Sequence, residues 1–290
     1  MKYSIILPTR NRRLMLMRAL DALGAQRGPG PEFEVIVIDN GSTDGTARAL
    51  AERRDGFPLR ILYEPEPNRA RARNAGLNAA SGDIAVFIDD DVIVPPHFLA
   101  AHAAVHREPG SLAVTGPILN VDSLEDRPKP AWRHRSRAFF CTCNASVPLA
   151  ELRHAGRFDE AFTGYGWEDT ELGVRLRERG LKHRFAWEAY AYHLKPHAGE
   201  RLDEAERRIR EKARMALLFT KKQPSMRVRL ATGNYRANLL RAALLNPRPL
   251  RPCFAALADA PRLPFALRAF ARSQYLDGVY VDELRKGGGG

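Results

Sequence analysis

The stretch Ala85-Val86-Phe87-Ile88-Asp89-Asp90-Asp91 is the most informative part of this 290-residue chain. Its apolar half, with two β-branched residues, predicts a buried strand. The three carboxylates that follow repel one another, which is costly at the end of a buried strand unless a cation lies beside them. Oxygen ligands suit Mg²⁺ or Mn²⁺, and open α/β sheets bind ligands at the carboxyl ends of their strands. A solvated acidic turn that caps the helix beginning near Pro96 is the alternative, and the stretch alone does not separate the two.

Strand and helix patterns alternate through the first 100 or so residues. Continuous apolar runs predict strands over residues 3–7, 33–38 and 59–63 ahead of the stretch quoted above. Helices follow them, ending near residue 23 and spanning 46–53 and 68–80, and Leu14, Met17 and Leu20 are expected on the buried side of the first. This alternation predicts a mostly parallel sheet with helices on both faces. No G-x-G-x-x-G follows the first strand, and no Walker motif occurs, which argues against dinucleotide-binding and Walker-type sites.

The second half of the chain is less regular. We expect strands over 112–118, 138–147 and 185–194, a helix over 167–179, and a long loop over 122–137. The spacing of Cys141, Cys143 and Cys253 forms neither a disulfide framework nor a zinc pattern, so buried free thiols are expected. His102 and His106 share a helix face without an acidic partner nearby in sequence, and we expect both at the surface.

From residue 200 the sequence becomes helical and basic. Helices are expected from about 200, over 234–245 and over 254–270, with 287–290 as a flexible glycine tail. Packing against the main domain is the favoured role for these helices, and contact with anionic membrane through arginine-rich amphipathic faces is the alternative.

The overall composition is that of an ordinary globular protein, with 44% hydrophobic and 28% charged residues. A net charge of +12 favours anionic partners. We expect no signal peptide and no membrane-spanning segment, because no apolar stretch approaches about 20 residues. The expected location is the cytoplasm, with the inner face of the membrane as a further possibility.

Four ordered motifs lie at the ends of successive predicted elements. They are Ser4-Ile5-Ile6-Leu7-Pro8-Thr9-Arg10-Asn11-Arg12, Val35-Ile36-Val37-Ile38-Asp39-Asn40-Gly41-Ser42-Thr43-Asp44, Ala72-Arg73-Asn74-Ala75-Gly76 and Asp89-Asp90-Asp91. Together they resemble a family 2 glycosyltransferase of the GT-A fold, and Gly166-Trp167-Glu168-Asp169 resembles the acceptor-side motif of β1,4-galactosyltransferase-like enzymes. The resemblance covers about residues 1–200. It implies an α/β fold with a mostly parallel, Rossmann-like sheet flanked by helices, followed by a C-terminal helical appendage.

The resemblance implies a nucleotide diphosphate sugar donor, with a UDP-sugar favoured. It assigns donor binding to Pro8, Thr9, Arg10, Asp39, Arg73, Asp89 and Asp90. Arg10 departs from the aromatic residue that the family often has there, although a guanidinium plane can stack on a base. Asp91 and His193 would hold Mn²⁺ or Mg²⁺, with His197 as the fallback for the histidine.

The same resemblance assigns the acceptor side of the reaction. Asp169 would be the catalytic base, Glu168 would assist it and bind acceptor hydroxyls, and Trp167 would offer its face to a sugar ring. A single displacement inverts the anomeric centre. The implied domains are a transferase domain over 1–199, divided into a donor half (1–110) and an acceptor and catalytic half (111–199), and a helical extension over 200–286.

The expected activity is therefore that of a metal-dependent, inverting hexosyltransferase in the synthesis of polysaccharide, lipopolysaccharide or another glycoconjugate. Its expected partners are the donor and a glycan or lipid-linked acceptor, without nucleic acid. Two other classes remain open from the sequence. A sugar nucleotidyltransferase would share the basic, Mg²⁺-dependent α/β domain but usually has a glycine-rich loop where Pro8-Thr9-Arg10-Asn11 stands. A non-catalytic module that binds polyanions would need neither Asp169 nor the carboxylate triplet.

Overall fold

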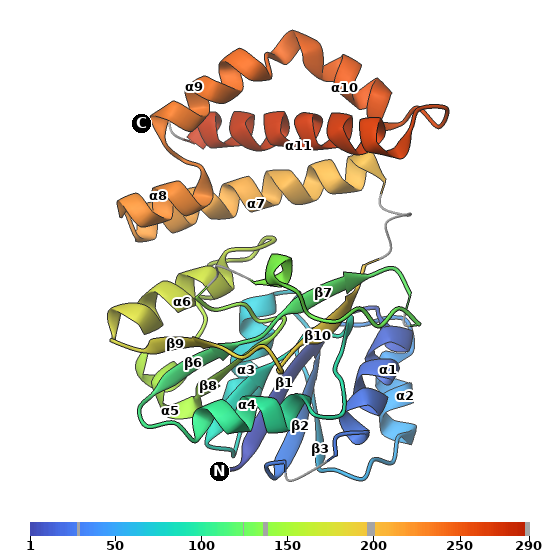
Figure 1. The fold of residues 1–290 in the computed structure, drawn as a ribbon, viewed down its shortest axis with the longest axis vertical. Coiled ribbons are helices and arrows are strands. Elements are labelled where there is room, and N and C mark those ends of the chain that lie inside the picture. The colour runs from blue at the N-terminus through green and yellow to red at the C-terminus, as the bar shows by residue number, and fades with distance from the viewer. Residues whose placement is uncertain (28–29, 124, 136–138, 196–200, 288–290) are drawn as a thin grey trace. The chain divides into compact units, whose positions relative to one another are not determined.

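The computed structural model describes residues 1–27, 30–123, 125–135, 139–195 and 201–287 (Figure 1). The chain forms two compact units. The first comprises Met1–Ala161 and Glu168–His197, and the second comprises Phe162–Trp167 and Ala198–Gly290. His197, the fallback metal ligand, lies outside the described residues.

A seven-stranded sheet forms the centre of the first unit. Its strands, in the order β3-β2-β1-β4-β8-β6-β9, are β3 (Leu59–Tyr63), β2 (Phe33–Asp39), β1 (Tyr3–Thr9), β4 (Ile84–Phe87), β8 (Ala145–Pro148), β6 (Leu112–Thr115) and β9 (Lys182–Phe185). All neighbouring pairs are parallel except the two that involve β8. The first four strands and the mostly parallel sheet are as the apolar runs predicted.

Helices connect and flank these strands. In chain order they are α1 (Arg13–Gly24), α2 (Thr46–Glu52), α3 (Arg69–Ala79), α4 (Phe98–His106), α5 (Leu149–His154) and α6 (Glu168–Glu178), with a short 3₁₀ turn, η1 (Trp132–His134). The Asn68 side chain caps α3 by accepting a hydrogen bond from the Arg71 amide. Leu20 is buried on α1 as predicted, but the prediction was wrong at Leu14, which is 69% exposed, because the helix turns Leu16 inward instead.

A second, three-stranded sheet has the order β5 (Val92–Ile93), β10 (Ala191–Leu194) and β7 (Ile118–Val121). The strand predicted over 112–118 was wrong because it divides into β6 and β7. At the break, Gly116 lies so close to the Ala189 carbonyl that a Cβ would be 1.8 Å from its oxygen, and Pro117 has no amide to donate. The strand predicted over 185–194 divides in the same way into β9 and β10. Of the strand predicted over 138–147, only the end is extended, in β8.

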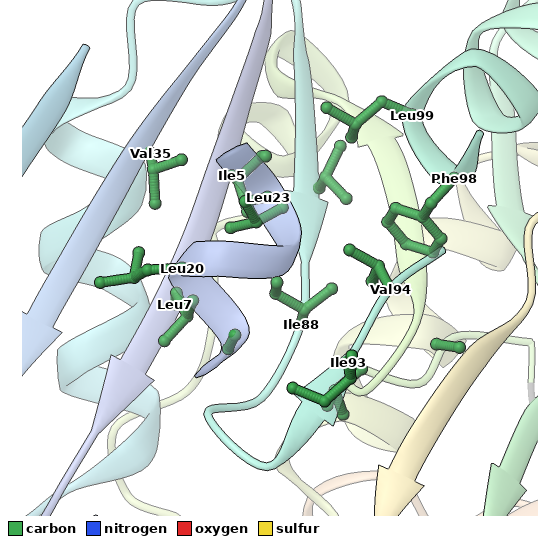
Figure 2. Close-up of a cluster of buried hydrophobic side chains, with 14 of the residues drawn as sticks. Ile5, Leu7, Leu20, Leu23, Val35, Ile88, Ile93, Val94, Phe98 and Leu99 are labelled. Carbon is green, nitrogen blue, oxygen red and sulfur yellow. The ribbon is translucent and has the colours of Figure 1, made fainter. Parts of the chain in front are cut away.

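Buried apolar side chains cover both faces of the large sheet. Figure 2 shows one cluster, in which Ile5 and Leu7 of β1 meet Leu20 and Leu23 of α1. Ile6, between the first two, belongs to the cluster on the opposite face, as the alternation of side chains along a strand requires. This arrangement explains why the strands read as continuous apolar runs.

His102 and His106 were wrongly predicted at the surface, because both are buried. The ring nitrogens His102 Nδ1 and His106 Nε2 lie 2.8 Å and 2.7 Å from the Ser146 hydroxyl, and His102 Nε2 lies 3.0 Å from the Asn144 amide oxygen. Burial lowers the pKa of His102 to about 3 and that of His106 to about 4. Both rings are therefore neutral packing groups between α4 and β8 at neutral pH. The prediction that the Cys253 thiol is buried was also wrong, since Cys253 is exposed.

The second unit is helical. Its elements are α7 (Leu202–Lys222), α8 (Met226–Thr232), α9 (Arg236–Leu245), the 3₁₀ turn η2 (Arg248–Leu250), α10 (Arg251–Ala258) and α11 (Phe265–Gly287). The helix predicted over 254–270 spans parts of two helices, because Pro261 and Pro264 fall between them. Among the described residues, no helix is both long and apolar enough to cross a membrane.

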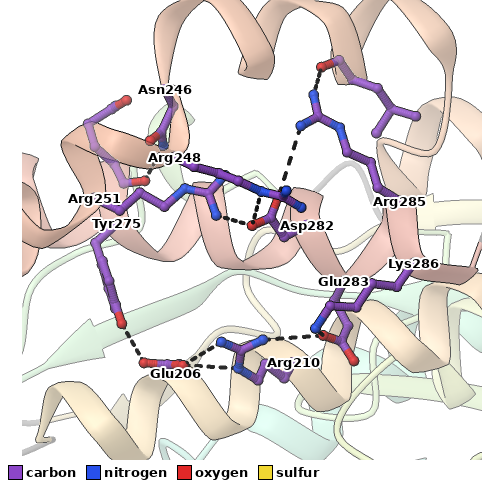
Figure 3. Close-up of polar contacts among 12 residues, drawn as sticks. Glu206, Arg210, Asn246, Arg248, Arg251, Tyr275, Asp282, Glu283, Arg285 and Lys286 are labelled. Carbon is purple, nitrogen blue, oxygen red and sulfur yellow. Dashed lines mark hydrogen bonds and ion pairs between the residues drawn. The ribbon is translucent and has the colours of Figure 1, made fainter.

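Polar contacts bind α11 to its neighbours on both sides (Figure 3). Asp282 accepts hydrogen bonds from Arg248, at 3.2 Å, and from Arg251. The next residue, Glu283, accepts from Arg210 of α7 at 3.3 Å, and the Tyr275 hydroxyl donates to Glu206 of the same helix. The polar inner faces of η2, α10 and α7 are therefore used to hold α11.

Candidate active site

The chain leaves β1, β2 and β4 at the same edge of the large sheet, because these neighbouring strands are parallel. Residues 10–12 follow β1, the loop from Asn40 follows β2, and the carboxylate triplet follows β4. The fold thus gathers the ends of three of the four sequence motifs at one edge, where ligands of open α/β sheets bind.

Asp39 ends β2 and is 2% exposed. Its Oδ1 accepts a hydrogen bond of 2.9 Å from the Ser42 amide, while its Oδ2 is buried without a hydrogen-bond partner. The adjoining loop is fixed by Asn11, which has a left-handed backbone (φ 52°) and whose side-chain oxygen accepts from the Thr43 amide at 2.7 Å. A buried acceptor on a fixed loop can receive a hydrogen bond from a ligand.

Asp90 points into the protein. It is 5% exposed, accepts a hydrogen bond of 2.7 Å from the Thr9 hydroxyl, and lies 3.0 Å from an Arg12 guanidinium nitrogen. Burial raises the pKa of Asp90 to about 6, against the opposing effect of Arg12. Thr9 and Asp90, both predicted donor-binding residues, are thus brought together and bonded to each other. The strand residue Pro8 is half-buried, and Arg10 is exposed at the edge.

Asp91 is brought next to His193, although the two residues are far apart in the sequence. β5 and β10 pair antiparallel with Val92 opposite His193, which brings His193 Nε2 to 3.3 Å from Asp91 Oδ1. Burial favours the neutral form of Asp91, but the charges and hydrogen bonds of His193 and Arg12 outweigh it and hold the pKa of this carboxyl below its usual range. Asp91 is therefore ionised at neutral pH.

The Asp91–His193 pair fits a divalent metal ion with two protein ligands. Among the described residues, Asp91 Oδ1 is buried without a well-directed hydrogen bond and lies 3.3 Å from His193 Nε2. A metal ion placed here would replace this contact and take the carboxylate oxygen and the imidazole nitrogen as ligands. Among the residues that the structure describes, no group of three or more His, Cys, Asp or Glu side chains is arranged to hold a metal. Any ion here would need its other ligands from water or a bound phosphate, as is common for Mg²⁺.

Arg12 is a site residue that the sequence analysis missed. One guanidinium nitrogen lies 3.0 Å from Asp90 Oδ1 and 2.6 Å from Asp91 Oδ2. This single cation contacts two of the three adjacent carboxylates and offsets part of their negative charge. The available signal was a second basic residue in Thr9-Arg10-Asn11-Arg12, directly after the strand that neighbours the carboxylates.

Arg73 links the carboxylate triplet to α6. Its guanidinium, on a residue only 3% exposed, lies 3.1 Å from Asp89 Oδ1 and 2.8 Å from Glu168 Oε1. Burial alone would lower the pKa of Arg73, but the charges of Asp89 and Glu168 reverse this and raise it. The other Asp89 oxygen accepts from the Cys143 thiol at 3.0 Å. A continuous series of ion pairs thus joins Asp89, Arg73 and Glu168. The sequence analysis had assigned the first two to donor binding and Glu168 to the acceptor side.

Asp169 lies in the first turn of α6, beside Glu168. Its Oδ1 accepts a hydrogen bond of 2.6 Å from the Thr170 amide, and its Oδ2 accepts a long one of 3.5 Å from the Thr142 amide. Burial, followed by the negative charge of Glu168, raises the pKa of Asp169 to about 6 even though Arg73 opposes the shift. A carboxylate with a pKa close to neutrality is suited to accept a proton at physiological pH.

Trp167 belongs to the second unit and has a left-handed backbone (φ 78°). Its indole nitrogen donates to the Lys212 carbonyl at 3.0 Å, and its ring packs against Phe219 with centroids 6.0 Å apart. The ring lines a cavity of about 730 Å³ together with Tyr235 and Tyr280. Trp167 is thus half-buried within the helical unit, with one side open to a cavity of ligand size.

This chain belongs to the family 2 glycosyl transferases, since the family model of that description matches residues 4–163. The fold agrees. The structure resembles *S. aureus* TarS residues 1–349 (TM-score 0.60, 20% identity, covering 99% of this chain and 92% of that one). It also resembles the mannosyltransferase PcManGT from *Pyrobaculum calidifontis*, solved with GDP-Man and Mn²⁺ (TM-score 0.65, 23% identity, 98% and 87% covered). These neighbours have the GT-A fold, as the sequence motifs predicted.

Relatives identified by sequence are also glycosyltransferases. The chain is 30% identical over 237 residues to the validoxylamine A glucosyltransferase of *Streptomyces hygroscopicus* subsp. limoneus, covering 67% of this chain and 52% of the relative. It is 25% identical to the chondroitin synthase of *Escherichia coli*, covering 67% of this chain and 34% of that protein. The chain therefore spans about half or less of the length of these relatives. These relatives agree with the family match in placing the chain among the family 2 glycosyl transferases.

Proposed function

We propose that this chain is an inverting hexosyltransferase that moves a sugar from a nucleotide diphosphate sugar to an acceptor hydroxyl. The observation that carries the proposal is the chain of contacts Asp89–Arg73–Glu168. It connects the carboxylates at the end of β4 to the first turn of α6, where Asp169 lies. The donor-side and acceptor-side residues therefore lie close together, on either side of one buried arginine, and a direct displacement depends on such closeness.

On the donor side, residues 1–110 bind the nucleotide. The buried, unpartnered Oδ2 of Asp39 accepts a hydrogen bond from the base, Arg10 stacks on the base from the exposed edge, and Pro8 and Thr9 shape the pocket floor. Asp89 binds the ribose while Asp90 fixes the loop through Thr9, and Arg73 forms an ion pair with Asp89. A UDP-sugar is the favoured donor, and the TarS neighbour has been solved with UDP-GlcNAc.

Asp91 and His193 hold Mn²⁺ or Mg²⁺ in this proposal, and the PcManGT neighbour was solved with Mn²⁺. A bound divalent ion stabilises the charge that develops on the departing nucleoside diphosphate. Imidazole is a softer ligand than carboxylate, so a site with one histidine favours Mn²⁺ over Mg²⁺. Arg12, which contacts both Asp90 and Asp91, reduces the negative charge of the pair.

Residues 111–199 supply the acceptor and catalytic groups. Asp169 takes the proton from the acceptor hydroxyl as its oxygen attacks the anomeric carbon, and the bond to the diphosphate oxygen breaks on the opposite face. Glu168, held by Arg73, positions the acceptor through its unpartnered Oε2. Trp167 offers its ring to an acceptor sugar. The displacement inverts the anomeric centre because one nucleophile enters opposite one leaving group.

The proposed setting is the synthesis of polysaccharide, lipopolysaccharide or another glycoconjugate. The acceptor is a glycan or a lipid-linked glycan, and the proposed location is the cytoplasm. The family match favours this activity over sugar-nucleotide synthesis and over non-catalytic binding of polyanions.

The test is nucleotide release from a panel of UDP-, GDP- and dTDP-sugars, with Mn²⁺ or with EDTA. We expect metal-dependent release of one nucleoside diphosphate, and loss of that release in Asp169→Asn with donor binding retained. Glu32→Gln, a change to an exposed carboxylate before β2, is the matched control. Release of pyrophosphate from a nucleoside triphosphate and a sugar phosphate would instead support the nucleotidyltransferase, and binding without turnover across the panel would contradict catalysis.

A further inference from the structure

The second unit exposes an unusual amount of apolar surface. Among the described residues, fourteen large hydrophobic side chains are exposed, and nine of them lie within residues 226–270. Exposed apolar residues scattered singly are normal, but a concentration of this kind marks an interaction site.

The exposed apolar residues follow the outer sides of consecutive helices. On α9, Leu240 and Leu244 are one turn apart and are 62% and 71% exposed. On α10, Leu257 is 44% exposed. The first two turns of α11 expose Phe265, at 60%, and Phe270, at 58%.

The inner sides of the same helices are already occupied. Arg248 and Arg251 turn inward to Asp282 of α11, and Figure 1 shows α9 and α10 on the side of α11 opposite to α7. The exposed apolar side chains therefore belong to faces that no described residue of the second unit covers.

Arginine accompanies these apolar residues. Residues 226–272 contain nine Arg, no Lys, and one acidic residue, Asp259. Three of these Arg pair with acidic residues of α11, Arg241 with Asp277 and both Arg248 and Arg251 with Asp282, which leaves six. Arg236 and Arg241 are exposed on α9, beside Leu240, and Arg262 is exposed just before α11. A positively charged surface repels a second copy of this protein and attracts an anionic surface.

We propose that this face docks the protein peripherally on an anionic lipid bilayer. The docking face consists of Leu240, Leu244, Leu257, Phe265, Leu267 and Phe270, with the neighbouring arginines. Leucine and phenylalanine enter the boundary between headgroups and acyl chains while guanidinium groups bind lipid phosphates, as in amphipathic helices that lie in a membrane interface. A soluble polyanion would use the arginines but would leave the phenylalanine and leucine side chains in water.

The proposal goes beyond sugar transfer and does not depend on it. It specifies which face of the protein meets a membrane. An acceptor embedded in the same bilayer and the docked enzyme would then both diffuse within the plane of the membrane, which raises the frequency at which they meet.

The test is co-sedimentation of the full chain with vesicles of phosphatidylcholine alone or mixed with phosphatidylglycerol. We expect binding to the mixed vesicles that weakens with added salt. The triple variant Leu257→Ser, Phe265→Ser, Phe270→Ser should lose at least about tenfold in binding. Arg236→Gln and Arg262→Gln should each lose roughly fivefold. Leu14→Ser with Tyr63→Ser, two exposed residues of the first unit (69% and 67%), and Arg18→Gln are the matched controls.

Equal binding to both kinds of vesicle, or unchanged binding by the triple variant, would overturn the proposal. So would sedimentation showing that the native chain dimerises and that the triple variant is monomeric while neither binds vesicles. Thermal stabilisation by UDP and Mn²⁺ is measured for every variant. That shift reports donor binding in the first unit, so its absence in the native chain would count against the proposed enzyme and not against the membrane face.

Discussion

The two units of this protein use charged and apolar residues in opposite ways. The first unit buries its large apolar side chains on both faces of a sheet and gathers acidic groups at one edge, where Arg12, Arg73 and His193 pair with them. The second unit buries a small core that includes Ala213 and Leu284, and exposes leucine, phenylalanine and arginine along its outer helices. The arrangement in the first unit suits a small, charged ligand, and the arrangement in the second unit suits an extended partner surface.

This difference separates two kinds of experiment. Changes at the sheet edge should alter nucleotide binding and chemistry without altering contact with a surface, and changes on the outer helices should do the reverse. The predictions below test that separation, starting with the largest expected effect.

The largest effect is expected for Asp91→Ala. Removing this carboxylate leaves His193 without its partner and deletes one proposed metal ligand, so transfer should fall by at least about 10³-fold, equivalent to several kcal/mol of lost charge stabilisation. Isothermal titration of UDP with and without Mn²⁺ measures the cause directly. If the variant binds nucleotide with the same Mn²⁺ dependence as the native chain, the metal is held elsewhere.

Asp169→Asn should lower kcat by roughly 10²-fold or more while donor binding stays nearly intact. Because the pKa of Asp169 is raised to about 6 and a base must be deprotonated to act, native activity should decline as the pH falls below about 6. The variant should lack this acid limb. Glu168→Gln is the comparison, and it should act mainly on the KM for acceptor. If Asp169→Asn turns over within a few-fold of the native rate, another residue is the catalytic base.

The buried histidines make the first unit sensitive to acid. The pKa of His102 is lowered to about 3 by burial, against an ordinary value near 6.5, so between these values the unfolded chain binds the extra proton. Its contribution to stability is therefore complete above about pH 6.5 and is lost as the pH falls, by about 2 kcal/mol at pH 5. Chemical denaturation at pH 7 and pH 5 measures the loss. His102→Gln should reduce the difference and the exposed His154→Gln should not; a native chain equally stable at both pH values would contradict the prediction.

The smallest effect is expected in the second unit. Asp282→Asn weakens the contacts of α11 with Arg248 and Arg251, and should cost about 1 kcal/mol, since Arg248 is largely exposed to solvent. Thermal unfolding should show the loss, while the shift produced by UDP and Mn²⁺ remains. Asp259→Asn, an exposed carboxylate of the same unit, is the control. A change in nucleotide binding in Asp282→Asn would show that the two units do not work separately.

The sequence predicted the first half of the fold well because buried parallel strands have a simple signature. The runs that form β1, β2 and β4 are continuously apolar and end in polar motifs. Such a run is typical of a parallel strand that is buried on both faces of a sheet. The prediction failed in the second half where one apolar run divides into two strands, as in β6 and β7. There the breaks depend on close backbone contacts, such as that between Gly116 and Ala189, which no local pattern reveals.

The same limit applies to the site. Asp91 and His193 could be proposed as neighbours only through family resemblance, because the pairing of β5 with β10 joins segments about 100 residues apart. Arg12 was missed because its contacts with Asp90 and Asp91 depend on the position of the guanidinium group at the end of a long side chain. The surroundings of His102 depend on Ser146 and Asn144, more than forty positions further along the chain.

The left-handed backbone of Trp167 bears on how this position changes during evolution. An L-residue in that conformation costs about 1–2 kcal/mol that glycine would avoid, so selection for stability alone would favour glycine here. A tryptophan persists at such a position only where its ring contributes more than the backbone loses. Substitutions at Trp167 should thus separate two selective pressures. Trp167→Gly relaxes the chain but deletes the ring, whereas Trp167→Phe keeps the strain and most of the ring, and the variant that better preserves fitness identifies which pressure acts at this residue.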